Sequence, residues 1–139
     1  MTEQVLRDAG WFPGRSVTTT EWENVLRESG DFEMHEAARL FLTEFGGLEI
    51  NQEGPGKNMA RSPFRLDPTV AKWDEEIFDV LSEEAGVYLY PIGDAFRRNQ
   101  YLGIAADGAV YLGMDSVMLL ARSPDRALEN LIEGIQGEQ

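Results

Sequence analysis

Apolar side chains recur every three or four residues in several parts of the chain, the spacing that places them on one face of a helix. These stretches predict four helices, each ending at or beside a glycine: 2–9, 20–30, 33–45 and 67–86. Thr20 and Glu23 fit a capping box, in which each side chain bonds the other residue's backbone amide. A fifth helix is predicted after Ser123-Pro124, a capping residue followed by a proline at the first helical position.

The helix predicted over 67–86 combines a narrow apolar stripe with a broad acidic face. Asp67 and Pro68 begin it as the capping residue and the first helical residue. The side chains expected to be buried recur at helical spacing: Val70, Trp73, Ile77, Val80 and Leu81. The outer face carries carboxylates and no basic residue: Asp74, Glu75, Glu76, Asp79, Glu83 and Glu84.

Short apolar runs rich in branched and aromatic residues predict strands, with turn residues between them. The runs lie at 48–50, 64–66, 87–92, 101–105, 109–113 and 117–121. Asp107-Gly108 predicts a two-residue hairpin turn, and Pro91 predicts an edge position or the end of its strand. The turn-rich segment 51–63 is expected to be a mobile loop. This order of elements favours an α+β fold with one mainly antiparallel sheet covered by helices.

Length and composition indicate one domain over residues 1–139, with 42% hydrophobic and 27% charged residues, as in average soluble globular proteins. The chain has 25 acidic and 12 basic residues, which gives a net charge of -13 spread along its whole length. Such a surface should repel nucleic acid and anionic membranes, because Lys and Arg supply most of the affinity for phosphate. It should attract basic partners instead, and like-charge repulsion favours a monomer.

The residue types present exclude several kinds of chemistry. No cysteine is available for disulfides, thiolate catalysis or iron–sulfur clusters. His35 is the single histidine, which excludes a His-based triad, and we expect it to be a surface or half-buried structural residue. The N-terminus has no signal-peptide pattern, and the apolar run Val117 to Ala121 is too short to span a bilayer. We therefore expect a cytoplasmic protein with no metal and no cofactor.

Glu75, Asp79 and Glu83 are spaced four residues apart, so their carboxylates share one face of the predicted helix. Three interpretations remain open for them: a solvated surface, a contact surface for a basic partner, and oxygen ligands for a divalent cation. Core anchoring and an exposed binding anchor are the alternatives for the three tryptophans, Trp11, Trp22 and Trp73. The sequence contains no recognisable catalytic set, which favours a binding protein.

Several short motifs follow one another along the chain, and only their order and spacing, taken together, are informative. Ala9-Gly10-Trp11 and Gly14-Arg15 are followed by the run Phe41 to Leu48 and by Phe64 with Asp67-Pro68. The later motifs are Leu89 to Gly93, Asp107 to Tyr111, and Ala127-Leu128 with Ile132 and Gly134. Over residues 8–134, this series resembles the SUKH superfamily, and most closely its third subgroup, which is typical of bacteria.

The resemblance implies an α+β fold and a function without catalytic residues. Bacterial members of the superfamily are largely immunity proteins of polymorphic toxin systems. Each binds a toxin domain, often a nuclease or a nucleic-acid deaminase, and thereby protects the producing cell. The superfamily also contains regulators and adaptors, so an intracellular adaptor that binds a host protein is the alternative.

Charge and resemblance together predict where a toxin is bound. A toxin that grips phosphates has a basic groove, and a polyanionic protein can occupy that groove in place of the nucleic acid. We expect the contact at four carboxylates of the acidic helix and at one in the preceding loop: Asp74, Glu75, Asp79, Glu83 and Glu53.

Overall fold

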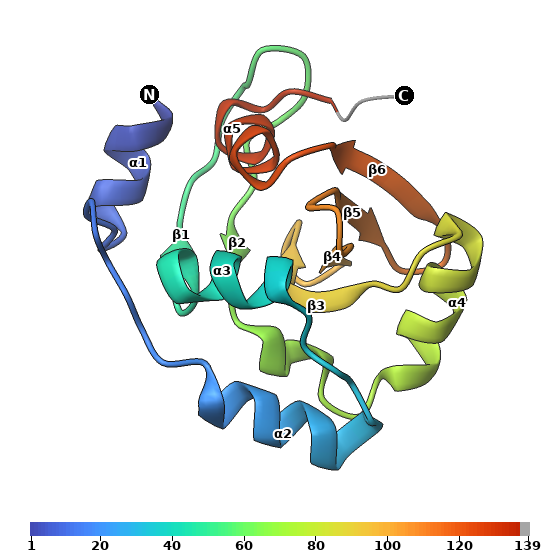
Figure 1. Ribbon diagram of the computed structural model, residues 1–139. Helices are drawn as coiled ribbons and strands as arrows, with labels where there is room; N and C mark the ends of the chain where they lie inside the picture. The colour runs from blue at the N-terminus through green and yellow to red at the C-terminus, as the bar shows by residue number, and fades with distance from the viewer. Residues whose placement is uncertain (137–139) are drawn as a thin grey trace.

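A six-stranded antiparallel sheet lies at the centre of the computed structural model, which describes residues 1–136 (Figure 1). Each strand pairs with the next one along the chain. The strands are β1 (Glu49–Ile50), β2 (Phe64–Arg65), β3 (Tyr90–Ala95), β4 (Gln100–Ile104), β5 (Val110–Gly113) and β6 (Val117–Ala121). The helices are α1 (Thr2–Asp8), α2 (Thr20–Gly30), α3 (Glu36–Phe45), the short 3-10 helix η1 (Pro68–Ala71), α4 (Glu75–Ala85) and α5 (Pro124–Glu133). The expected α+β class with one antiparallel sheet is confirmed.

The helices bury their apolar sides against the sheet, and the buried side chains form one connected cluster. Figure 1 shows α3 in front of the sheet, with α2, α4 and α5 around its border. The fully buried residues include Phe64, Ile92, Leu102 and Ile104 from the strands and Leu26, Leu42 and Phe78 from the helices. Each such side chain contributes about 1.5–3 kcal/mol through burial. One connected core suits the single domain expected over residues 1–139, which stays a prediction.

Helix α2 begins differently from the sequence prediction. Thr19, and not Thr20, precedes its first turn, and the backbone of Thr19 is already helical (φ −104°, ψ −2°). In that conformation its side chain makes no capping bond to an amide of the first turn. The Thr19 hydroxyl instead donates to the carboxylate of Glu23 at 2.9 Å. The capping-box prediction is therefore wrong.

Helix α3 begins at Glu36, later than the sequence pattern suggested, because the imidazole of His35 caps it. His35 Nδ1 accepts a hydrogen bond from the Ala38 amide at 3.2 Å. The other ring nitrogen, Nε2, then carries the proton and donates to the carbonyl oxygen of Ile104 on β4 at 3.0 Å. The single histidine is half-buried and structural, as expected, and it connects α3 to the sheet.

The segment 67–86 forms two helices, where the sequence pattern predicted one. The short helix η1 ends at Ala71, and α4 begins at Glu75. Between them the backbone of Trp73 has φ +72°, a left-handed value that no right-handed helix contains. The break turns part of the predicted stripe outward, so that Trp73 is 71% exposed and Val80 is 53% exposed. The prediction that these two side chains are buried is wrong.

Strand β3 begins later than predicted and extends further, from Tyr90 to Ala95. Its second half pairs with β2 through Asp94 and Ala95, whereas its first half pairs with β4 alone. Pro91 lies in that first half, where β3 has a locally free edge on one side. Proline has no backbone N–H to donate, and at this position its absence removes no hydrogen bond between β3 and β2. This agrees with the edge position inferred from the sequence.

Two connections complete the fold. The β4–β5 turn contains three residues, 106–108, and not two, because the Ala105 amide donates to the Ala109 carbonyl at 2.9 Å. The β1–β2 loop is hydrogen-bonded to the end of α5, for example from the Lys57 amide to the Glu133 carbonyl at 3.0 Å.

Within residues 1–136, no helix is long and apolar enough to cross a membrane.

Candidate protein-binding face

Helix α4 is held against the sheet by Phe78 and Leu81, its buried residues. The ring of Phe78 lies 5.2 Å from that of Tyr101 on β4, measured between ring centroids. Before the first turn, the carboxylate of Asp74 accepts a hydrogen bond from the Tyr101 hydroxyl. After the last turn, Gly86 adopts the left-handed backbone that ends the helix (φ +78°). These contacts fix which side of α4 faces outward.

The outward side of α4 carries carboxylates without a basic residue on the same helix. Glu76, Asp79 and Glu83 are exposed, and their spacing places them on successive turns of one side. Glu75 is half-buried on the flank of α4, close to Gly30 of α2. A Cβ atom added to Gly30 would lie 3.0 Å from the Cβ atom of Glu75. Glu75, Glu76, Asp79 and Glu83 form the acidic face of α4, and three of them were predicted as contact residues.

The charges of the acidic face act on one another and on Tyr88. Burial raises the pKa of Glu75, and the neighbouring charges of Asp79 and Asp31 raise it further. Burial also raises the pKa of Tyr88, and the charges of Asp79 and Glu75 act in the same direction. The Tyr88 hydroxyl accepts a hydrogen bond from the Glu33 amide at 3.0 Å. Negative charge therefore concentrates where α4, the segment after α2 and Tyr88 meet.

Exposed apolar side chains lie beside these carboxylates. Four of them belong to α4 or to the residues next to its ends, with these exposed fractions: Trp73 71%, Val80 53%, Val87 38% and Tyr88 47%. Val80 is one helical turn from Glu76 and Glu83, so its apolar side chain is bordered by carboxylates. Exposed apolar groups within a charged rim are typical of a surface that binds another protein.

The two remaining predicted residues have different surroundings. Asp74 is half-buried, and its carboxylate is engaged by Tyr101 at the base of α4. Glu53 lies in the β1–β2 loop, which passes α5 and is well separated from α4 in Figure 1. Its carboxylate is 3.9 Å from the guanidinium of Arg97, and both side chains are exposed. The structure therefore does not bring Glu53 to the acidic face.

An open cavity of about 670 Å³ lies beside Glu53, between α1 and the β1–β2 loop. Its charged lining mixes both signs, with Asp8 and Glu49 near Arg61 and Arg97. Arg61 is already engaged, because its Nε donates to the Ile132 carbonyl at 2.9 Å. The lining contains no histidine, serine or lysine that a carboxylate could activate. Among the residues described, no three histidine, aspartate or glutamate side chains converge as a metal site.

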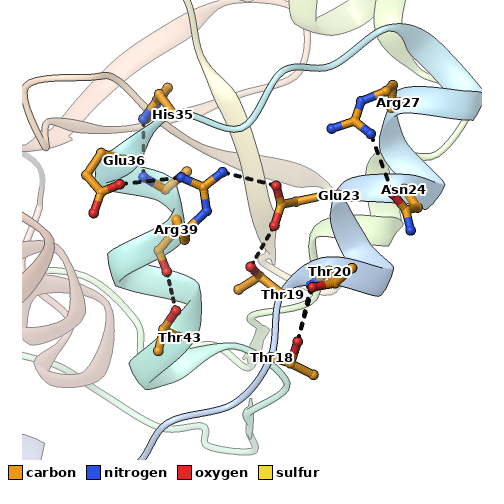
Figure 2. Close-up of polar contacts among 11 residues, drawn as sticks. Thr18, Thr19, Thr20, Glu23, Asn24, Arg27, His35, Glu36, Arg39 and Thr43 are labelled. Atoms are coloured by element: carbon orange, nitrogen blue, oxygen red, sulfur yellow. Dashed lines mark hydrogen bonds and ion pairs between the residues drawn. The ribbon is translucent and has the colours of Figure 1, made fainter.

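A second polar cluster joins α2 to α3 (Figure 2). The Glu23 carboxylate accepts hydrogen bonds from the Arg39 guanidinium at 3.0 Å and from the Thr19 hydroxyl at 2.9 Å. Burial opposes ionisation of Glu23, but the bonds from Arg39 and Thr19 lower its pKa below the usual value. Arg39 also bonds Glu36 at 3.4 Å, and Thr43 donates to the Arg39 carbonyl at 2.7 Å. This cluster holds two helices together and offers little to a ligand.

Trp73 was predicted to lie on the buried stripe, with an exposed binding anchor as the alternative, and Tyr88 was not predicted as a surface residue. Trp11 and Trp22 pack against the core, which confirms core anchoring for both, whereas Trp73 is exposed. A local signal existed for Trp73, because it stands between Lys72 and Asp74 at the beginning of an acidic run. Tyr88 was assigned to a strand, and its exposure follows from the later start of β3.

Comparison with known proteins adds one finding. The family model described as "SUKH-3 immunity protein" matches residues 1–134 of this chain, nearly its whole length. No curated protein and no solved structure matches it. The match agrees with the α+β fold and with the superfamily that the sequence motifs suggested.

Proposed function

We propose that this chain, which belongs to the SUKH-3 immunity protein family, binds and neutralises a toxin domain that acts on nucleic acid, a nuclease or a deaminase. Family membership implies a toxin-neutralising immunity function, a protein partner and a role that is not enzymatic. In the finer proposal, the toxin belongs to a bacterial polymorphic toxin system. The chain neutralises it in the cytoplasm, as a monomer and without catalysis of its own.

The observation that carries this proposal is the acidic face of α4. A nuclease or deaminase grips the phosphates of its substrate with Lys and Arg, so its substrate groove is basic. A face with four carboxylates and no basic residue on its helix complements such a groove. The net charge of -13 also accelerates the encounter, because steering between opposite charges can raise association to about 10⁸–10⁹ M⁻¹s⁻¹ at low salt.

Within this proposal the predicted contact residues have unequal roles. Asp79 and Glu83 contribute exposed charges on one side of α4, and Glu75 adds a half-buried charge on the flank of that side. Asp74 contributes its charge from the base of the helix, where Tyr101 holds it. Glu53 takes part only if the toxin also extends over the β1–β2 loop.

The first experiment is co-expression of this chain with a candidate toxin domain. If the operon of this chain encodes a large secreted protein, the C-terminal domain of that protein is the candidate, and it is expressed in a bacterial host with and without this chain. We expect the toxin domain to stop growth alone, and we expect this chain to restore growth and to form a 1:1 complex in gel filtration. Arrested growth together with the absence of a complex would contradict the proposal.

The acidic face is tested by reversing three of its charges to lysine: Glu75→Lys, Asp79→Lys and Glu83→Lys. The matched control reverses three exposed carboxylates on other helices, Asp8→Lys, Glu21→Lys and Asp125→Lys, so both variants change the net charge equally. We expect the first triple variant to slow association at least about tenfold and to flatten its salt dependence, with a much smaller effect of the control. Equal effects of the two variants would leave only the net charge, and not the acidic face, as the cause.

A further inference from the structure

Trp73 is exposed in a way that the packing of this chain does not account for. Its side chain is 71% exposed, whereas Trp11 and Trp22 pack against the core. The indole of Trp11 also donates a hydrogen bond to Glu44 at 3.1 Å. The Lys72 ammonium lies over the Trp73 ring, 5.6 Å from the ring centroid. An exposed indole of this kind is available to a partner.

The backbone of Trp73 is strained, in addition to the exposure of its side chain. Its φ of +72° lies in the left-handed region, which glycine and asparagine adopt readily and bulky residues avoid. Hydrogen bonds of the next residue, Asp74, maintain this backbone conformation. The Asp74 amide donates to the Ala71 carbonyl at 2.9 Å, and the Asp74 carboxylate accepts a hydrogen bond from the Tyr101 hydroxyl. Strain of this kind persists where the surrounding structure imposes it, often at binding sites. A tryptophan at this position thus opposes the local backbone preference without adding buried area.

The charges around Trp73 indicate which kind of partner can reach it. Asp74, Glu75 and Glu76 follow directly in the sequence, and the first turn of α4 displays the carboxylates of Glu75 and Glu76. Any protein surface that covers the indole must therefore come close to these charges. A surface that presents Lys and Arg around an apolar pocket satisfies both features at once.

We propose that Trp73 is the apolar anchor of the toxin interface, inserted into a pocket of the toxin domain whose rim is basic. This inference rests on the proposed function and names the residue that supplies affinity, whereas the acidic face supplies the rate of encounter. Binding energy at interfaces is concentrated in a few residues, and tryptophan is among the most frequent of them. The strained turn presents the indole before the toxin arrives, so little conformational freedom is lost on binding.

The test compares Trp73→Asn with the wild-type chain against the candidate toxin domain. Asparagine suits a left-handed backbone, so this variant is expected to keep or raise the Tm while it removes the indole. We expect Kd to weaken at least about 30-fold, which corresponds to the roughly 2 kcal/mol that defines an anchoring residue, mainly through faster dissociation. The salt dependence of association should stay at the wild-type value, unlike in the triple charge reversal.

Two controls separate an anchor from a general loss of apolar surface. Phe12→Asn and Leu40→Asn remove exposed apolar side chains from other parts of the surface, 54% and 63% exposed, and should change Kd less than about threefold. Tryptophan emission of the wild-type chain should shift to shorter wavelength in the complex, because the indole of Trp73 leaves water. The shift should be absent in Trp73→Phe, which keeps an aromatic ring there.

The outcomes distinguish this inference from the function on which it rests. A wild-type chain that neither binds the toxin domain nor protects the host overturns both. A wild-type chain that protects, with Trp73→Asn binding within about threefold of it, overturns the anchor alone and leaves the immunity function standing. Should Trp73→Asn fold poorly, the emission spectrum decides: a complex without a wavelength shift overturns the anchor.

Discussion

The hydroxyl of Tyr101, on β4, donates a hydrogen bond to the carboxylate of Asp74, the residue that precedes the first turn of α4. The two residues are 27 positions apart in the chain. Burial of the Tyr101 phenol raises its pKa, and the bond to Asp74 raises it further, so the phenol is protonated at neutral pH and can donate. This contact connects the middle of the sheet to the turn that displays Trp73.

Replacing Tyr101 by phenylalanine should therefore destabilise the protein, because it removes the hydroxyl that contacts both the Asp74 carboxylate and, at 3.3 Å, the Val70 carbonyl. Tyr101→Phe leaves the half-buried Asp74 carboxylate without this donor, and we expect the free energy of unfolding to fall by about 1–2 kcal/mol in urea. Tyr111→Phe, on β5, is the control, because Tyr111 is half-buried and makes no comparable bond among the described contacts. Equal losses in the two variants would mean that the bond to Asp74 contributes nothing.

The same contact explains why local sequence patterns misjudged the segment 67–86. Apolar residues recur there at helical spacing, and a continuous helix satisfies that pattern. The chain instead ends one helix at Ala71 and begins another at Glu75, which places Phe78 and Leu81 against the sheet. The choice depends on packing against β4, a distant segment, so periodicity within the segment cannot reveal it.

The number of strands in the sheet could be predicted from the sequence more closely than the limits of each strand. Six apolar runs gave six strands, and 117–121 was placed within its correct limits. Strand β3 was displaced because its end is set by pairing with β2 at Asp94 and Ala95, which an apolar run does not encode. For the candidate face, helical spacing brought Glu75, Asp79 and Glu83 together correctly. Glu53 was misplaced because nearness in the sequence says little about the path of a loop.

The cap formed by His35 leads to a second prediction, on the stability of α3. His35→Ala removes the acceptor for the Ala38 amide and the donor to the Ile104 carbonyl, and should lower the free energy of unfolding by about 1–2 kcal/mol. His35→Asn keeps an oxygen that can cap the helix and should recover part of that loss. Chemical denaturation of the three proteins tests the order. An asparagine variant no more stable than the alanine variant would show that capping is not the role of His35.

The ion pair between Glu23 and Arg39 gives a prediction on pH. Because the pKa of Glu23 is lowered in the folded protein, its contribution to stability is complete above the usual value of 4.5 and is lost as the pH falls through the folded value. The stability difference between wild type and Arg39→Ala should therefore be larger at pH 6.5 than at pH 3.5. It should stay modest, since the Arg39 side chain is 40% exposed.

The control for this prediction removes the titrating group. In a background that carries both Glu23→Gln and Glu36→Gln, replacing Arg39 by alanine should have an effect that no longer varies with pH over the same range, because both carboxylate partners of Arg39 are removed. Urea unfolding at several pH values measures all four proteins. A difference between wild type and Arg39→Ala that grows towards pH 3.5 would contradict the assignment, because it has the opposite sign.

The acidic face, which we propose as the binding surface, should reduce the stability of the fold. The pKa of Glu75 is raised by burial and by the charges of Asp79 and Asp31, so ionised Glu75 destabilises the fold once the pH rises above its folded value. Glu75→Gln should therefore raise the Tm at pH 7, and the gain should vanish near pH 4 and shrink at 0.5 M salt, about a 4 Å Debye length. Glu21→Gln, an exposed carboxylate of α2, should change the Tm little. A Glu75→Gln variant that loses stability equally at both pH values would contradict this view. We expect the same substitution to slow association with the toxin, so one variant tests both the proposed contact role of Glu75 and its cost to stability.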